Sequence, residues 1–140
     1  MQAYSCRTMT IEDYDDVYAL WTGMPGIGLS EADGREPIEA YLARNPGQSF
    51  VCETDESIVG AILCGNDMRR AYIHHLAVAP EHRRCGLASE LVRLATGVQR
   101  GLGIQKCHLF VVTGNDGGVA FWRAMGYEKR TDIEIMSKML

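Results

Sequence analysis

The residues best suited to chemistry follow an apolar segment near the middle of the chain. Arg83 and Arg84 are followed by Cys85 and Gly86, and an amphipathic run begins at Leu87. The first N–H groups of a helix are unpaired and carry partial positive charge, so a helix beginning here would offer an anion site. Glycine lets the backbone approach a phosphate closely, and arginine adds charged, directional hydrogen bonds. The stretch therefore predicts a phosphate-binding turn.

The two common phosphate fingerprints do not account for this turn. It lacks both the Gly-Lys-Ser/Thr of a P-loop and the Gly-x-Gly-x-x-Gly of dinucleotide-binding proteins. A nucleotide-binding protein of another fold is kept only as an alternative. Cys85 lies inside the turn and is either a reactive thiol or inert packing, and we prefer the second interpretation.

Together with the segment before it, the turn resembles the acetyl-CoA motif of the Gcn5-related N-acetyltransferase (GNAT) superfamily, Arg/Gln-x-x-Gly-x-Gly/Ala. The match is Arg83-Arg84-Cys85-Gly86-Leu87-Ala88, after the strand end Leu76-Ala77-Val78-Ala79-Pro80 that is usual in the family. A second match lies downstream. There, Asn115, Trp122 and Gly126-Tyr127 have the spacing of members similar to ribosomal-protein alanine acetyltransferases. The resemblance covers nearly the whole chain and is greatest to small bacterial members.

The resemblance implies an enzyme, an N-acetyltransferase. It would move an acetyl group from acetyl-CoA to a primary amine of a small molecule or peptide, by direct attack in a ternary complex. Acetyl-CoA is the expected co-substrate, and no metal is expected. The residues expected to contact acetyl-CoA are Leu76, Ala77, Val78, Arg83, Arg84, Cys85, Gly86, Leu87, Ala88, Ser89, Asn115 and Trp122. The alternative is a CoA-binding regulatory or interaction module with little or no catalysis.

Acetyl transfer needs a base for the amine, a donor for the oxyanion and a proton for the leaving thiolate. The resemblance places the oxyanion donor at a backbone N–H near Leu76. Strand alternation over 71–78 puts Tyr72, His74, Leu76 and Val78 on one face and Ile73, His75 and Ala77 on the other. The family pattern uses positions on the first of these faces for a base, and histidine titrates near neutral pH, so the resemblance makes His74 the candidate base, directly or through water. The alternative for His74 is a hydrogen-bonded core or cleft histidine, and His75 is expected to pack in the core or on the opposite face.

The chain departs from the family pattern at the thiolate acid. Many members have a tyrosine at the position that Trp122 holds here, and an indole N–H has no usable acidity. Either solvent protonates the thiolate or another group such as Tyr72 does.

The acceptor site is expected between the first helix and the loop over 23–36. Its apolar wall would include Trp21, Met24, Ile27 and Leu29, and a cationic amine would be attracted by Glu31, Asp33 and Glu36. Solvated loop residues are the alternative interpretation.

The elements that must position these residues follow from periodicity and turn signals. We expect strands over 3–7, 49–53, 58–64, 71–78, 106–112 and 133–140, and helices over 11–20, 37–43, 87–100 and 119–125. Thr10 and Asp13 have the spacing of a capping box. The order predicts a mixed α/β protein with helices packed on a central sheet. The resemblance implies the GNAT fold, an α/β (α+β) arrangement with a central mixed, mostly antiparallel sheet flanked by about four helices, in a single domain over 1–140.

Composition excludes several classes of protein. The 140 residues are 46% hydrophobic and 23% charged, which is ordinary for a globular domain. The net charge is −4 without a lysine-rich run, so no nucleic-acid partner is expected. No apolar run approaches a membrane span and no signal peptide is visible, which predicts a cytoplasmic protein with no membrane partner. Exposed residues of the last strand could pair between subunits, which allows a homodimer.

The five cysteines are an odd number without a Cys-x-x-Cys pair, so a disulfide framework and a zinc site are not expected. Reduced and mostly buried thiols are the prediction for Cys6, Cys52, Cys64, Cys85 and Cys107.

Overall fold

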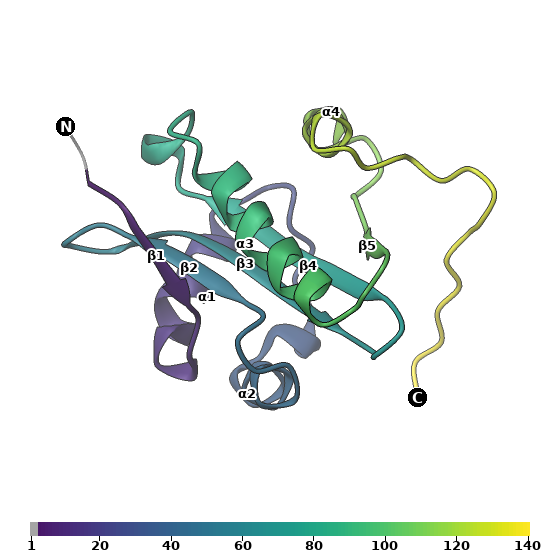
Figure 1. The fold of residues 1–140 in the computed structure, drawn as a ribbon, viewed down its shortest axis with the longest axis horizontal. Coiled ribbons are helices and arrows are strands. Elements are labelled where there is room, and N and C mark those ends of the chain that lie inside the picture. The colour runs from purple at the N-terminus through teal and green to yellow at the C-terminus, as the bar shows by residue number, and fades with distance from the viewer. Residues whose placement is uncertain (1–2) are drawn as a thin grey trace. The chain divides into compact units, whose positions relative to one another are not determined.

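The computed structural model describes residues 3–140, which divide into two compact units (Figure 1). The first unit ends at Phe110 and the second spans Val111–Leu140. In the first unit the sheet has five strands among the described residues, β1 (Ser5–Thr8), β2 (Phe50–Glu53), β3 (Ile58–Asn66), β4 (Ala71–Val78) and β5 (Cys107–Leu109). Neighbours in this order pair with each other, antiparallel from β1 to β4 and parallel between β4 and β5. The predicted mixed, mostly antiparallel sheet is confirmed.

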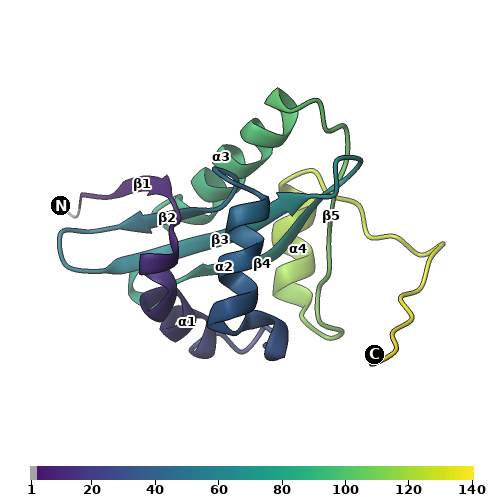
Figure 2. The same cartoon turned by 90° about the horizontal axis from the view of Figure 1, so that it is seen from below.

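Helices cover both faces of this sheet. Figures 1 and 2 show α1 (Tyr14–Thr22) and α2 (Arg35–Arg44) on one face and α3 (Leu87–Gly101) on the other. The second unit contains α4 (Asp116–Ala124). Short 3-10 turns precede α1, α2 and α3 at η1 (Ile11–Asp13), η2 (Glu31–Asp33) and η3 (Pro80–His82). Among the described residues, no helix combines the length and apolar character that crossing a membrane requires.

Local sequence explains where the first helical segment begins. The predicted capping box forms: the Thr10 N–H donates to Asp13 Oδ2 at 2.9 Å, and Asp13 is held in turn by two hydrogen bonds from Arg7. The Arg7 guanidinium lowers the pKa of the Asp13 carboxyl, which keeps this side chain charged. In α3 the stripe Leu87, Leu91 and Ala95 is buried, as its spacing predicts.

The prediction of a closing strand over 133–140 is wrong. These residues form neither helix nor strand, and Ile135 and Met136 are 69% and 93% exposed. A strand needs a neighbour to pair its N–H and C=O groups, and within the described residues this segment has none. The fifth strand is also shorter than predicted, three residues instead of the span 106–112.

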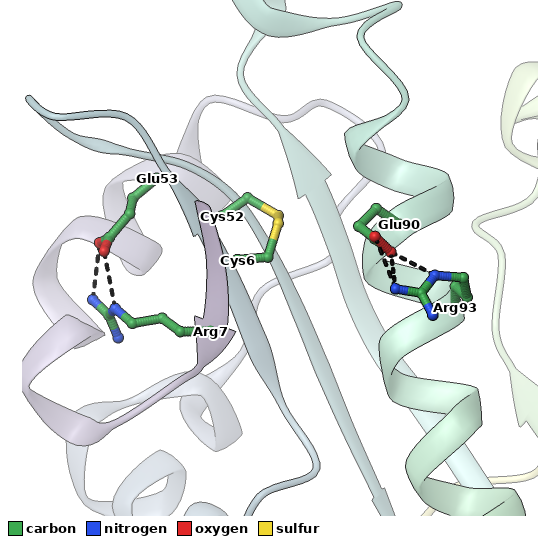
Figure 3. The surroundings of a disulfide bond; sticks show 6 residues. All are labelled: Cys6, Arg7, Cys52, Glu53, Glu90 and Arg93. Carbon is green, nitrogen blue, oxygen red and sulfur yellow. Dashed lines mark hydrogen bonds and ion pairs between the residues drawn. A yellow bond between two sulfur atoms is a disulfide. The ribbon is translucent and has the colours of Figure 1, made fainter. Parts of the chain in front are cut away.

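The prediction that all cysteines are reduced is also wrong. Cys6 and Cys52 face each other across the antiparallel pair of β1 and β2 and form a disulfide (Figure 3). Strand alternation sends the next residues, Arg7 and Glu53, to the other side, where they form a two-point ion pair. The cysteines outside the disulfide are Cys64, which is buried, Cys107, which is half-buried, and Cys85, which is exposed.

Candidate functional site

A β-bulge in β4 determines the geometry of the candidate site. Leu63 of β3 pairs with His75, but the next residue, Cys64, pairs with Ile73, so His74 is left without a partner. A bulge bends its strand and interrupts the ladder of hydrogen bonds locally. The main chain at His74 is therefore released from regular pairing in the middle of the sheet.

The bulge overturns the predicted faces of β4. His75 and Ala77 pack with α1, because His75 contacts Trp21 and Ala77 belongs to the core cluster of α1. His74 lies on the same face, against Tyr41 of α2 at 5.5 Å between ring centroids. Val78 instead lies near Leu91 on the α3 face. The extra residue shifts the two-residue alternation by one, so His74 and His75 share a face, whereas the sequence predicts opposite faces.

Of the two adjacent histidines, His74 is the one whose ring nitrogens are available to a substrate. Its ring stacks on Tyr72 with 12° between the planes and 6.3 Å between centroids, and it makes no hydrogen bond with the described residues. The side chain is exposed, yet the surrounding protein removes part of its hydration. This desolvation, with His75 nearby, lowers the pKa of His74, while Asp33 opposes the shift. The imidazole is thus neutral at pH 7 and can accept a proton.

His75 is committed to the protein interior. Its Nε2 lies 2.7 Å from Oδ1 of Asp33, and the two side chains are 11% and 9% exposed. Asp33 also accepts a hydrogen bond from the Ser30 N–H, and its carbonyl accepts one from the Tyr14 hydroxyl. The expectation that Asp33 attracts a cationic acceptor is wrong, because its carboxylate is buried and paired. Trp21 does not line an open acceptor site either, because its side chain is buried in the core and only 1% exposed.

Sequence analysis did not single out His108. The parallel pairing of β4 with β5 places His108 beside Tyr72, with ring centroids 5.6 Å apart. Tyr72 therefore lies between two histidines. No motif marks His108, and only the register between strands that are far apart in the sequence brings it to this site.

The predicted phosphate-binding turn forms a left-handed loop before α3. Arg84 and Gly86 have φ values of 62° and 78°, and Gly86 is the N-cap of α3. Arg83 is held by contacts of its guanidinium with the Val78 carbonyl and with Sδ of Met24. The residues from Arg83 to Gly86 are exposed, as an anion site requires.

Tyr4 contributes to this turn from the N-terminal segment, which sequence analysis did not predict. Its hydroxyl lies 2.9 Å from Nδ1 of His82 and donates to Sγ of Cys85 at 3.5 Å. No sequence signal marked Tyr4, because these partners follow it by about 80 positions.

The edge of β4 is open between the bulge and the turn. Pairing with β5 covers Ala71, Tyr72 and Ile73, and the described residues include no strand that continues this pairing toward Leu76 and Val78. The main chain from Leu76 to Val78 therefore has no strand partner on this side among the described residues, although the Val78 carbonyl accepts a hydrogen bond from Nε of Arg83 at 3.4 Å. An extended amide-bearing ligand can pair with such an edge.

The second unit holds the two remaining candidate residues. Asn115 is the N-cap of α4, and its Oδ1 accepts a hydrogen bond from the Gly118 N–H at 3.0 Å. Trp122 packs against Phe121 and Tyr127, with centroids 5.1 and 5.0 Å apart. Gly126 permits this return of the chain, since its φ is 95°.

A cavity of about 210 Å³ opens beside His74. It is lined by Tyr41, Arg44, Asn45, Gly65, Asn66, Asp67, Tyr72 and His74. Gly65 is required here, because a Cβ at this position would collide with the Tyr41 hydroxyl and the Asn45 side chain. Within residues 3–140, no group of three or more histidine, cysteine or acidic side chains is arranged to hold a metal ion.

Comparison with known proteins identifies the family. The model of the acetyltransferase (GNAT) family matches residues 14–127. An acetyltransferase of Photorhabdus laumondii is 30% identical over 139 residues, which cover 96% of this chain and 94% of that protein. Ard1 from Thermoplasma volcanium superposes with a TM-score of 0.78 at 23% identity, covering 89% of this chain and 82% of its own. The PaiA N-acetyltransferase from Thermoplasma acidophilum, solved with coenzyme A, superposes with a TM-score of 0.75 at 18% identity, and the match covers 90% of each chain. This chain therefore belongs to the acetyltransferase (GNAT) family and is an acetyl-CoA-dependent N-acetyltransferase, as its sequence predicts.

Proposed function

We propose that the protein acetylates a primary amine of a small molecule or peptide by direct attack within a ternary complex, with His74 as the base. The observation that carries this proposal is the free, neutral imidazole of His74 at the bulge of β4. Its neighbour His75 is already paired with Asp33, so His74 alone of the two is free to take a proton.

The first unit offers the features that acetyl-CoA binding needs. The pyrophosphate would lie at the turn from Arg83 to Ser89, where the helix N-terminus and the arginines favour an anion. The pantetheine arm would pair with the open edge of β4 at Leu76, Ala77 and Val78. From the family pattern, Asn115 and Trp122 are the proposed further contacts to the cofactor.

The chemistry is a transfer between two bound substrates. The amine nitrogen attacks the thioester carbonyl carbon, a C–N bond forms, and the C–S bond breaks with release of the CoA thiolate. His74 takes the proton that the amine loses, and a backbone N–H near the bulge, between His74 and Leu76, donates to the oxyanion. Tyr72, which contacts both His74 and His108, is the proposed proton donor to the thiolate. Acetyl-CoA is the only co-substrate that we propose.

Calorimetry with acetyl-CoA, followed by an amine panel with detection of free thiol, tests this function. We expect stoichiometric binding and amine-dependent release of CoA. The variant His74→Ala should keep acetyl-CoA binding and lose most of the turnover. No binding would overturn the cofactor assignment. Stoichiometric binding without release on any amine would favour a CoA-binding module instead.

A further inference from the structure

We propose that the cavity beside His74 is an acceptor pocket for an amine that also carries a carboxylate, such as an amino acid, and that Arg44 binds this carboxylate. The inference rests on the proposed function, because it takes His74 as the base that accepts the proton of the amine. It adds the chemical class of the acceptor, which the catalytic residues alone do not define.

The polar groups of the pocket fall into two sets, and the amides are already satisfied. Asn45 donates to the Tyr41 carbonyl and accepts from the Asn66 N–H. Asn66 donates to Gln48 and Gln99 and accepts from the Met68 N–H. These side chains form the wall of the pocket, and each is already held by hydrogen bonds within the protein.

The only acidic side chain of the lining is also committed. Oδ1 of Asp67 accepts hydrogen bonds from the N–H groups of Arg69 and Arg70 at 2.9 and 2.8 Å, and its Oδ2 lies 3.7 Å from the Arg69 guanidinium. The backbone hydrogen bonds lower the pKa of this carboxyl, so its charge serves the turn between β3 and β4. The Asp67 carboxylate therefore stays charged, but its Oδ1 is held by the turn and its Oδ2 lies beside the Arg69 guanidinium.

The uncommitted groups favour an anion. Arg44 lies in the last turn of α2 and has no hydrogen-bond or ion-pair partner within the described part of the chain. The Tyr41 hydroxyl is buried beside Gly65 and has no partner there either. Burial raises the pKa of this phenol, so it remains a neutral hydrogen-bond donor. Arg44 is thus the charged side chain of the lining that has no partner among the described residues, and guanidinium binds carboxylate with two directional hydrogen bonds.

The position of the pocket fits an acceptor of this class. His74 and Arg44 line the same cavity, so a compact ligand can present its amine to His74 while its carboxylate meets Arg44. The rings of Tyr41, Tyr72 and His74 supply flat walls for the carbon skeleton between these two groups. A volume of about 210 Å³ is sufficient for an amino acid.

Matched pairs of amino acids and their carboxamides, for example L-phenylalanine and L-phenylalaninamide, test the proposal. We expect kcat/KM to favour the carboxylate members by about tenfold or more, which is typical of a charge-assisted hydrogen bond. In Arg44→Gln the ratio of kcat/KM for the acid to kcat/KM for its carboxamide should fall to about one, and Arg44→Lys should retain part of the preference for the acid. Arg35→Gln is the control on the same helix, since Arg35 pairs with Asp15 and does not line the pocket, and it should keep the ratio.

Binding and turnover separate the two proposals. Calorimetry with the same amino acids and amides, with CoA present, reports on the pocket even where no product forms. Arg44-dependent binding of carboxylates without turnover would overturn the proposed catalysis and support the pocket. Turnover with equal rates for acids and amides, a ratio that Arg44→Gln leaves unchanged, or no binding of any carboxylate would overturn the pocket.

Discussion

Two adjacent histidines in the same strand have different environments, and this difference defines the candidate site. His75 is paired with a buried carboxylate, whereas His74 is exposed, without a hydrogen bond, and neutral at pH 7. His75 therefore stabilises the junction between β4 and the loop before α2. His74 remains free for chemistry, although the two residues are identical in type.

The pH dependence of the reaction follows from the lowered pKa of His74. A base must be unprotonated, so kcat/KM should rise with pH and reach its plateau with a midpoint below the usual histidine value of about 6.5. In His74→Gln this acid limb should disappear and the plateau should fall by about 10²- to 10⁴-fold. The dissociation constant of acetyl-CoA, measured over the same pH range, separates binding from catalysis. An unchanged profile in the variant would remove His74 as the base.

Gly86 allows a test of charge at the proposed pyrophosphate site. Its φ of 78° is one that aspartate and asparagine tolerate better than most residues, and a Cβ there meets no atom within 4 Å. Gly86→Asp and Gly86→Asn therefore differ chiefly in charge. We expect Gly86→Asp to abolish acetyl-CoA binding in calorimetry, while Gly86→Asn weakens it much less. Equal affinities in the two variants would contradict the phosphate assignment.

At the scale of the elements, β4 was predicted with its observed bounds, but its bulge was not. Periodicity over 71–78 gives a strand, and the alternation then assigns faces. The bulge arises from pairing with β3 across the turn Asp67–Arg70, and no residue type in β4 demands it. A one-residue slip in register reverses every later face, so this small irregularity decides which side chains meet.

The disulfide links two strands that the turn signals did not connect. It joins β1 and β2 across a sequence separation of 46, and closing a loop of that size in the unfolded chain is worth about 4 kcal/mol in the chain-entropy model. Cys6→Ser should lower the free energy of unfolding in urea by up to about this amount. Reductant should lower it similarly in the wild type and leave Cys6→Ser unchanged. Cys85→Ser, which alters an exposed free thiol, is the control and should keep the sensitivity to reductant.

At the scale of the whole molecule, charge is distributed unevenly along the chain. Residues 1–70 carry five basic and twelve acidic residues, while 71–140 carry nine basic and six acidic ones. The basic half contains the proposed phosphate-binding turn, which suits a polyanionic cofactor. In the acidic half, several carboxylates are already used: Asp13, Asp33, Glu53 and Asp67 all have partners. The distribution of charge thus allows a polyanionic cofactor at the basic half, and it does not identify the acceptor.

The disulfide bears on the predicted cytoplasmic location. Disulfides persist in oxidising compartments and are rare in the reducing cytosol. If the protein works in the cytoplasm, rapid alkylation of intact cells should find Cys6 and Cys52 largely reduced, and the purified protein should oxidise in air. Mass spectrometry of the labelled peptides measures both states. A disulfide retained in freshly alkylated cells would contradict the cytoplasmic prediction.

The sequence by itself determined the order and type of the helices and strands of the first unit, the place of the loop before α3 and the family. These depend on local signals: the apolar stripe of α3, the capping box at Thr10 and Asp13, and the arginines before Gly86. Only the tertiary structure decided which side chains share a site. The bulge at His74, the pairing of Asp33 with His75, the approach of His108 to Tyr72 and the free guanidinium of Arg44 all depend on contacts between distant segments. Periodicity along one chain reports which face of an element is apolar, but it contains no information on the register between elements.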